Sequence, residues 1–446
     1  MVLLILEKLN SAVWSGIFLP CVLLCGLLIS FRSRFLQFRL FRASLRQLTR
    51  RDRQGRGISP MQAASTALAS TLGTGNIVGT AQAIALGGPG AIFWMWVAAV
   101  LGMAVKFAEI SLSAAKRRRV GGGYIGGPMY YIESLGKGFR PLAAAYALLA
   151  ALSAFGIGNL SQISSAAGAV SSAAARLAPA ADTRLLRLCL GICLSIAAWL
   201  ILRGGAGKVG RAAERLVPAM AGLFLLLSLL VLCCHAQALP RTLRDIFVCA
   251  FSPRSAAAGA GGFCSAQAIQ WGLRRGAFSN EAGLGSSAIA HGSAEALSPG
   301  HEGLWGIFEV FADTIVICTA TALTILCSGV NIPWGSAPGA ELLLAAWETC
   351  IPPAPASVFM ALSLLLFAFT SVLGWALYGT QCAAYLGGKK AAAPYRFCFS
   401  LAITLGCLMP LRTLWAAADL LNGLMAVPNF IALFALSGEA AGYAKP

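Results

Sequence analysis

The residues best suited to binding chemistry form one stretch inside an apolar region, LGTGNIVGTAQAIALGGPG at positions 72–90. It holds six glycines, an asparagine, two threonines and a proline, which are poor helix formers in the middle of an expected membrane helix. Unwinding a helix in hydrocarbon exposes N–H and C=O groups, and each group left unpaired is costly. Freed N–H groups can bind a carboxylate and freed carbonyls a small cation, so the stretch predicts a site for an amino acid together with Na⁺.

Hydroxyl and amide side chains add further candidate ligands. Gly73 and Gly75 let a ligand approach the backbone closely. Asn76 can offer an amide oxygen to a cation or donate to a substrate, or it can cap the helix end at the break. The adjacent Thr370 and Ser371 carry oxygens that suit a hard alkali cation, although such hydroxyls often bond back to their own helix.

Other polar side chains at expected membrane depth leave more than one interpretation open. Asn159 and Gln162 are three residues apart and share a helix face, where they serve either the site or helix–helix hydrogen bonding. Lys106 lies three residues before Glu109, which fits a structural pair. The acids Glu281, Glu309 and Asp313 also fall in apolar segments. Glu309 and Asp313 could bind a coupling proton or cation, or they could pair with Arg274 and Arg275 in a gate.

Composition identifies the elements that position these residues as membrane helices. Of 446 residues, 58% are hydrophobic and 11% charged, against roughly 25% charged in soluble domains. Mean hydropathy is +0.75, and apolar runs recur that are long enough to cross a bilayer core of about 30 Å. The net charge of +18 comes from basic clusters between these runs, which excludes nucleic-acid binding in favour of membrane topology. The 14 cysteines form no CxxC pair and predict packing, with neither a metal site nor a disulfide framework.

The apolar runs predict an all-α polytopic membrane protein with about eleven transmembrane helices. Their expected cores are residues 11–30, 59–84, 90–115, 141–177, 184–203, 212–236, 257–290, 303–328, 355–386, 395–410 and 413–436.

Basic residues predict the orientation in the cell membrane. Loop 32–56 carries nine arginines, whereas loops 178–182 and 329–355 carry no basic residue. Loops rich in basic residues alternate with loops that have few or none. This alternation predicts that the N-terminus lies outside and the C-terminus in the cytoplasm. The clusters assigned to the cytoplasmic ends of spans are 116–119, 137–140, 203–211, Arg274 with Arg275, and 389–396.

Glycine-rich breaks at matching positions predict an internal repeat. Without the first helix, ten spans remain, and glycine-rich breaks interrupt the first span of each group of five: at 72–90, and at AAAGAGGFCSAQ and NEAGLG within 256–285. Five is an odd number, so the two halves are inverted, which is typical of secondary transporters. The expected organisation is residues 1–58 for an extra helix and basic loop, 59–236 for the first repeat, and 237–446 for the second repeat and a short tail.

At this point the chain resembles the alanine or glycine:cation symporter family, also called sodium:alanine symporters. The resemblance extends from about residue 59 to 430. The matching motifs are GTGNIVGTAQAIALGGPGAIFWMW with KFAE (73–109), GGPMYYIE (126–133), Gly158, Asn159 and Gln162, RGAFSNEAGLGSSAIAH (275–291) and, less specifically, GWALYG (374–379).

The resemblance implies uptake of alanine or glycine with Na⁺ as coupling ion, no organic cofactor, and a five-plus-five inverted-repeat fold similar to that of amino acid/polyamine/organocation transporters. We separately expect the protein to function as a monomer, although no residue pattern determines the oligomeric state. The implied substrate ligands are Thr74, Gly75 and Asn76 at the first break, Gly262 and Phe263 at the second, and Gln162 and Trp375. The implied Na⁺ ligands are the carbonyls of Ala69 and Leu72 and the hydroxyls of Thr370 and Ser371.

Two departures keep alternatives open. Family members usually have proline where this chain has Ser287, and Gln267 follows Phe263 in a polar run, so a larger or more polar substrate is an option. Proton coupling through Glu309 or Asp313 is a second option. A sensor that binds an amino acid without transport is a third. An enzyme is not expected, because no cluster of His, Cys or acidic residues has catalytic spacing.

Overall fold

A computed structural model describes residues 2–49, 58–120, 123–252, 265–409 and 412–445. Within these ranges the regular structure is helical apart from one hairpin, β1 (Arg118–Val120) and β2 (Gly123–Ile125), which pair antiparallel with Arg119 opposite Tyr124. The predicted all-α polytopic fold with interrupted helices is therefore confirmed.

The described residues up to position 234 form a series of helices besides the hairpin. They are α1 (Val2–Ser11), η1 (Ala12–Phe18), α2 (Leu19–Arg32), α3 (Leu36–Arg39), α4 (Phe41–Arg46), η2 (Gln47–Thr49), α5 (Pro60–Thr71), η3 (Gly75–Gly79), α6 (Thr80–Gly87), α7 (Ala91–Lys116), α8 (Pro128–Glu133), η4 (Lys137–Phe139), α9 (Arg140–Phe155), η5 (Gly156–Leu160), α10 (Ser161–Leu177), α11 (Thr183–Leu202) and α12 (Gly205–Cys234).

The remainder of the chain is built in the same way. Its helices are η6 (Ala236–Ala238), α13 (Leu239–Phe251), α14 (Ser265–Asn280), α15 (Ser286–His291), α16 (Pro299–Val310), η7 (Phe311–Cys318), α17 (Thr319–Cys327), α18 (Glu341–Glu348), α19 (Pro353–Gly387), α20 (Lys389–Leu408) and α21 (Arg412–Gly442). Among these elements η1, η3, η5 and η7 are π-helical, and η2, η4 and η6 are 3₁₀ turns.

Nine helical stretches of the described chain are long and apolar enough to cross a membrane. They coincide with nine of the predicted spans. The other two predicted spans, 59–84 and 257–290, correspond to α5–α6 and α14–α15, whose separate pieces are short because each is interrupted. The total of eleven stays a prediction. The nine stretches are Ile5–Arg32, Ala91–Lys116, Lys137–Leu177, Thr183–Leu202, Gly205–Cys234, Pro299–Cys327, Pro353–Gly387, Lys389–Leu408 and Ala416–Gly442.

Local sequence explains where the interrupted helices begin and end. α5 begins with a capping box, in which the Ser59 hydroxyl accepts from the Gln62 N–H and the Gln62 side chain accepts from the Ser59 N–H. Pro60 follows as the first helical residue, where its missing N–H has no cost. α6 ends at Gly88, whose positive φ of 73° suits glycine at a helix end.

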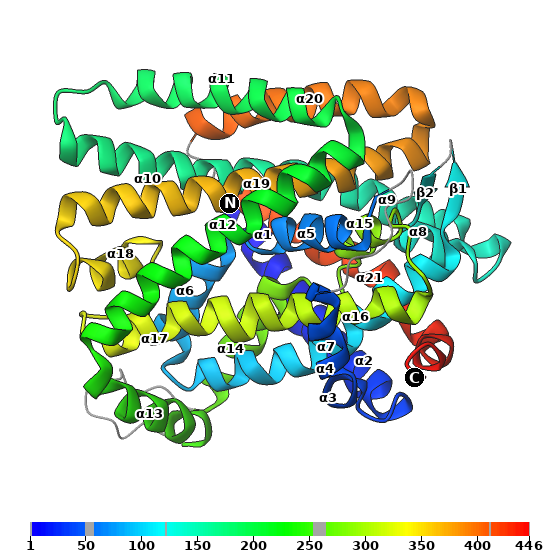
Figure 1. Cartoon of the computed structure of the whole chain (residues 1–446), viewed down its shortest axis with the longest axis horizontal. Coiled ribbons are helices and arrows are strands. Elements are labelled where there is room, and N and C mark those ends of the chain that lie inside the picture. The colour runs from blue at the N-terminus through cyan, green and yellow to red at the C-terminus, as the bar shows by residue number, and fades with distance from the viewer. Residues whose placement is uncertain (1, 50–57, 121–122, 253–264, 410–411, 446) are drawn as a thin grey trace.

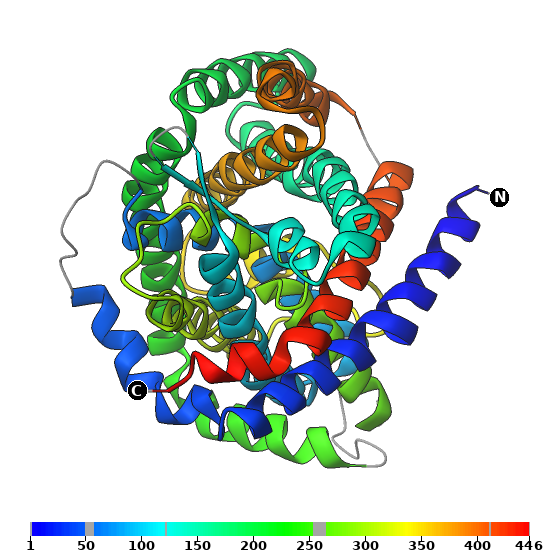
Figure 2. The same cartoon turned by 90° about the vertical axis from the view of Figure 1, so that its right-hand side faces the viewer.

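The long helices run mostly along the long axis of the molecule (Figure 1). α7 packs against α14 and α16, α19 packs against α5, α9 and α10, and α11 pairs with α20. Seen from the end that carries β1 and β2, many helices are viewed nearly along their axes, and α21 lies beside α1 and α2 at the edge of the bundle (Figure 2). α15 lies inside this arrangement, where it contacts α5, α7 and α19.

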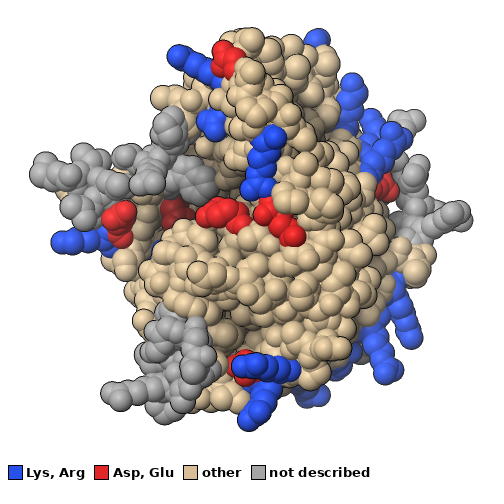
Figure 3. Space-filling view, turned by 90° about the vertical axis from the view of Figure 1, so that its left-hand side faces the viewer, with Lys and Arg blue, Asp and Glu red and all other residues tan. Residues whose placement is uncertain are grey.

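Charged side chains differ between the two ends of the bundle. The end with α3, α4, α8 and the hairpin carries basic residues such as Arg118, Lys137 and Arg140 (Figure 1). The opposite end carries α18 and the turn between α10 and α11, and acidic side chains gather along a furrow in its middle (Figure 3). Asp182 and Glu341 belong to elements of that end. The orientation that the basic loops predict stays a prediction.

Candidate functional site

The first break lies between α5 and η3. Leu72 takes an extended conformation (φ −72°, ψ 91°) directly after α5. In a continuous helix the N–H of Gly73 would donate to the carbonyl four residues earlier. It donates instead to Asn76 Oδ1 at 3.0 Å. The N–H and the hydroxyl of Thr74 both donate to Gln162 Oε1, each at 3.0 Å. Side-chain amides thus replace two of the backbone hydrogen bonds that a continuous helix would have.

The diverted N–H groups leave backbone oxygens at the end of α5. The carbonyls of Ala69 and Ser70 lose the donors that a continuous helix would give them. The Leu72 carbonyl accepts from the Ser371 hydroxyl at 3.2 Å, across 299 residues of sequence. Carbonyl and hydroxyl oxygens suit a hard monovalent cation. Of the four predicted Na⁺ ligands, Leu72 and Ser371 are therefore in contact, and Ala69 lies three residues before Leu72 on α5.

Thr370, the fourth predicted cation ligand, is placed differently. Its hydroxyl donates to the carbonyls of Leu366 at 2.9 Å and Phe367 at 3.0 Å in its own helix, and it contacts Met220 Sδ at 3.2 Å. The hydroxyl thus bonds back to α19, which was the alternative interpretation of this residue. No contact joins it to Leu72 among the described hydrogen bonds.

The second break follows α14. Glu281 has a positive φ of 56°, which is uncommon for a residue with a side chain, and Gly283 follows with φ 94°. The N–H of Ala282 donates to Asn280 Oδ1 at 3.0 Å, and that of Gly283 donates to Glu109 Oε1 at 3.0 Å. The helix restarts as α15. The predicted break at NEAGLG is therefore present, whereas the predicted ligands Gly262 and Phe263 lie outside the described residues.

Glu109 from α7 holds the second break. Its Oε1 accepts from the N–H groups of Gly283 and Gly285 and from Asn429 Nδ2 at 2.6 Å. A carboxylate at the start of α15 is favourable because the first N–H groups of a helix have no partner within it. Lys106, one turn earlier on α7, donates to the carbonyl of Asn280 at 2.8 Å. Lys106 and Glu109 therefore act on the two sides of the break, and both are fully buried.

A buried carboxylate joins the first broken segment to the second. Asp313 in η7 accepts from Asn76 Nδ2 at 2.6 Å, from the Ser279 hydroxyl at 2.8 Å and from the Thr314 hydroxyl at 2.8 Å. Asn76 is fully buried; its Oδ1 accepts from the Gly73 N–H, and its Nδ2 donates to Asp313 Oδ1. Asn76 is thus both a cap at the break and a link between segments far apart in the sequence.

The two breaks face one small cavity. Gly73 approaches closely here, because a Cβ at this position would lie 3.0 Å from Ser371 Oγ and from Gln162 Oε1. The cavity has a volume of about 20 Å³ and brings together the predicted residues Gly75, Gln162 and Trp375; Thr74 adjoins it through its bonds to Gln162. Its lining residues are Ser70, Thr71, Gly73, Gly75, Ile157, Gln162, Phe278, Ser279, Glu281, Trp375 and Asn422.

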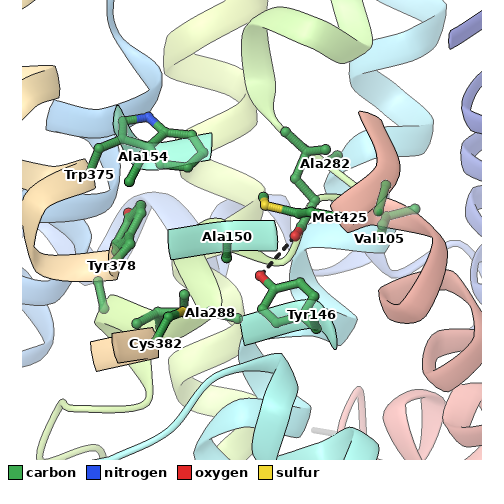
Figure 4. Close-up of a cluster of buried hydrophobic side chains, with 14 of the residues drawn as sticks. Val105, Tyr146, Ala150, Ala154, Ala282, Ala288, Trp375, Tyr378, Cys382 and Met425 are labelled. Carbon is green, nitrogen blue, oxygen red and sulfur yellow. Dashed lines mark hydrogen bonds between the residues drawn. The ribbon is translucent and has the colours of Figure 1, made fainter. Parts of the chain in front are cut away.

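The packing around Trp375 explains the shape of this wall. Its indole lies against α9 near Ala154 and above Tyr378 (Figure 4). A Cβ at Gly158 would come within 2.3 Å of Trp375 Cβ, so only glycine fits there. Nearby, the Tyr146 hydroxyl donates to the carbonyl of Leu284 at 3.0 Å, which fixes the second break from α9 (Figure 4).

A wider pocket leads from this region toward the acidic end of the molecule. It shares Thr74, Gly75, Gln162 and Phe278 with the central site and is also lined by Asp419. Arg274 and Arg275 line it as well, together with Gln82 and Ala337, so they lie toward the end that the basic loops predict to be outside. They do not lie at the end that carries the other basic clusters, because both belong to the interior of α14 beside the central site.

Neither Glu309 nor Asp313 contacts these arginines among the described residues, so the gate with them stays a prediction. Glu309 Oε1 contacts His291 Nε2 at 2.5 Å, and His291 Nδ1 contacts Glu302 Oε1 at 2.6 Å; all three side chains are buried. Asp313 contacts Asn76, as described above. Each acid therefore has a partner from within the core.

Sequence reasoning missed Ser279, Asn422 and the roles of Glu109 and Asp313. One available signal was the SNEAG motif, which contains Ser279 beside the break. Three π-helical segments also mark the site: η3 with Asn76, η5 directly before Gln162, and η7 with Asp313. π-Helical segments occur frequently at functional sites. No residue pattern in FADTIVIC, the sequence of η7, predicts that it is π-helical.

The comparisons with known proteins agree with this geometry. The model of the sodium:alanine symporter family matches residues 1–445. A sodium/alanine symporter (AgcS) of Methanococcus maripaludis is 39% identical, with 97% of this chain and 94% of the relative covered. A probable sodium/glutamine symporter (GlnT) of Bacillus subtilis is 37% identical, with 96% and 87% covered.

The fold also resembles that of a solved membrane transporter. A manganese transporter of Eremococcus coleocola superposes with a TM-score of 0.54 at 12% identity, covering 89% of this chain and 79% of the other. At this identity the likeness concerns the fold alone. The family match over nearly the whole chain shows what the paired helix breaks indicate: the protein is a membrane transporter, not an enzyme, and it belongs to the sodium:alanine symporter family.

Proposed function

We propose that this transporter imports a small neutral amino acid, alanine or glycine, together with Na⁺ by alternating access. The observation that carries the proposal is the small cavity between two helix breaks, with backbone and amide groups from both. The family and the sodium/alanine relative support the same substrate class and ion.

Each ligand has a place in this proposal. Na⁺ binds beside the break, to the carbonyls of Ala69 and Leu72 and the hydroxyl of Ser371. The amino-acid carboxylate binds at the start of η3, near Gly75 and Gln162, where helix N–H groups attract anions. Cation binding then pre-organises the break for the amino acid, so the two bind with positive coupling.

The sodium gradient supplies the driving force. Each charge that crosses the membrane gains about 2.3 kcal/mol per 100 mV. The wider pocket described above fits an outward-facing access route, because it reaches the central cavity from the acidic end. We further propose that residues 59–236 and 237–446 are the inverted repeats, that the N-terminus is outside, and that one copy of the chain suffices for transport.

A proton-coupled version of the same uptake is the second candidate. It is favoured by Asp313, a fully buried carboxylate whose three hydrogen-bond donors, Asn76, Ser279 and Thr314, are all neutral. A buried carboxylate whose hydrogen-bond donors are all neutral gains from binding either a proton or a cation, and the buried Lys106 is the one cation that interacts with it among the described residues. The coupling ion therefore has to be measured.

Uptake of labelled alanine into proteoliposomes tests the proposal. Replacing external Na⁺ by choline at fixed pH should abolish uptake, whereas collapsing a proton gradient in the presence of Na⁺ should leave it intact. Unlabelled glycine should compete strongly and glutamine weakly, because the cavity is small. Uptake that persists in choline and follows the proton gradient would establish the second candidate instead.

A further inference from the structure

The central cavity has a single formally charged side chain among its described lining residues, and that residue is Glu281. The residue is 8% exposed and lines the cavity. Its Oε2 accepts from the Ser286 hydroxyl, and the Trp375 indole lies close to the same carboxyl group. The Ser286 hydroxyl thus holds the carboxyl group of this cavity-lining residue.

The end of α14 adds further acceptors beside Glu281. In a continuous helix Ala282 and Gly283 would donate to the carbonyls of Phe278 and Ser279. Both N–H groups are diverted, to Asn280 Oδ1 and Glu109 Oε1. Phe278 and Ser279 line the cavity, so this wall combines helix C-terminal carbonyls with a carboxylate.

The opposite wall has the reverse polarity. There η3 begins, with Gly75 as its first residue, and the positive end of a helix attracts anions. A zwitterion in the cavity is therefore oriented: its carboxylate lies toward Gly75 and Gln162, and its ammonium group lies toward Glu281 and the last carbonyls of α14. The positive φ of Glu281 fits this role, because strained backbone at a cavity persists where function requires it.

We propose that Glu281 binds the α-ammonium group of the transported amino acid and thereby selects amino acids over hydroxy acids and simple carboxylic acids. The proposal rests on the proposed function and adds a specificity-determining residue to it. Selection follows because a ligand without an ammonium group leaves the buried Glu281 carboxylate and the carbonyls of α14 unpaired.

Other charged groups near Glu281 do not take over this role. Lys106 and Asp313 interact electrostatically with its carboxyl group. Lys106 donates to the carbonyl of Asn280, and Asp313 is bonded to Asn76, Ser279 and Thr314. Neither lines the cavity, whereas Glu281 does.

The test compares alanine with lactate, which carries a hydroxyl in place of the ammonium group. In the unaltered protein lactate should inhibit alanine uptake very weakly. In Glu281→Gln the KM for alanine should rise by about thirtyfold or more, as expected when one partner of a buried charged pair is removed. The ratio of the lactate and alanine inhibition constants should fall by about tenfold, since the neutral amide accepts a hydroxyl donor.

Two further variants separate charge from structure. Glu281→Asp keeps the carboxylate and should keep the discrimination against lactate even where KM rises, and it carries the test alone if Glu281→Gln does not fold. Glu133→Gln, at the end of α8 where Glu133 pairs with Arg118 and Arg140, should leave both constants unchanged. A ratio that Glu281→Gln leaves at its original value, or one that Glu281→Asp relaxes, overturns the proposal.

The two proposals fail separately. Absence of Na⁺-dependent alanine uptake by the unaltered protein counts against the proposed function; shifts of melting temperature with alanine and lactate then replace the uptake assay for Glu281. An unchanged KM combined with lost proton dependence in Glu281→Gln would make Glu281 a proton carrier and would also overturn its role as ammonium ligand.

Discussion

At the scale of single residues, Thr370 and Ser371 show how neighbours in one helix come to differ. The Ser371 hydroxyl reaches the Leu72 carbonyl across the bundle, whereas the Thr370 hydroxyl bonds to its own helix and contacts Met220. The sequence presents them as an equivalent pair. Only the rotation of α19 against α5 distinguishes them.

This difference gives a prediction for Na⁺ affinity. Ser371→Ala should raise the Na⁺ concentration for half-maximal alanine uptake by about tenfold, because a lost contact to a charged group is worth about 1.5–3 kcal/mol. Thr370→Val, the matched control, should change it by less than about twofold, since its hydroxyl serves its own helix. Equal effects of the two substitutions on Na⁺ dependence would contradict the cation site.

Asn76 shows that two interpretations of one residue can both hold. Its oxygen caps the break at Gly73, and its nitrogen binds Asp313. The sequence indicated the break and the amide, since Gly73, Gly75 and Asn76 are adjacent. It contained no indication of Asp313, because that contact joins positions 237 residues apart.

At the scale of elements, α15 and α16 are fastened together by a buried cluster. His291 at the end of α15 lies between Glu302 and Glu309 of α16, with contacts of 2.6 and 2.5 Å. Both contacts can be hydrogen bonds only if each carries a proton, so the cluster holds one proton more than a neutral imidazole with two carboxylates. The short helix after the second break is thereby anchored to α16.

Removal of this histidine should destabilise the protein. His291→Ala leaves two buried carboxylates without their partner, and we expect the free energy of unfolding to fall by about 3–5 kcal/mol. Chemical unfolding of the detergent-solubilised protein measures this. His235→Ala, at the end of α12 and partly exposed, is the control and should have little effect. An unchanged unfolding midpoint in His291→Ala would show that the cluster does not support α15.

At the scale of the whole molecule, acidic side chains gather along a furrow at one end of the bundle, and the opposite end carries basic residues of the hairpin and η4. The wider pocket opens toward the acidic end, and the buried contacts of Glu109 and His291 lie between the central cavity and the basic end. This arrangement corresponds to access from one side and closure on the other, which alternating access requires of each end state.

Orientation in the cell membrane can be measured directly. We expect a fluorescent protein fused after residue 446 to fluoresce and a periplasmic phosphatase fused there to be inactive, because the positive-inside rule places the C-terminus in the cytoplasm. Fusions within the turn between α10 and α11 should give the opposite result. Phosphatase activity at the C-terminus would reverse the direction of the proposed access route.

The sequence by itself determined the fold class, the nine long helices and the first break, because these follow from local properties: apolar length, helix propensity and the spacing of glycines. It also placed Gly75, Gln162 and Trp375 in one site through a family resemblance. It did not place Arg274 and Arg275, whose end of the bundle depends on how α14 enters it.

Only the tertiary structure decided what completes the broken helices. The N–H groups freed at Thr74 and Gly283 bind Gln162 and Glu109, residues from other helices. The tertiary structure also decided that Glu281 faces the cavity. Such partners depend on the packing of segments distant in sequence. A buried polar group must be satisfied by whatever packing brings beside it, so its partner cannot be read from its own neighbours in the chain.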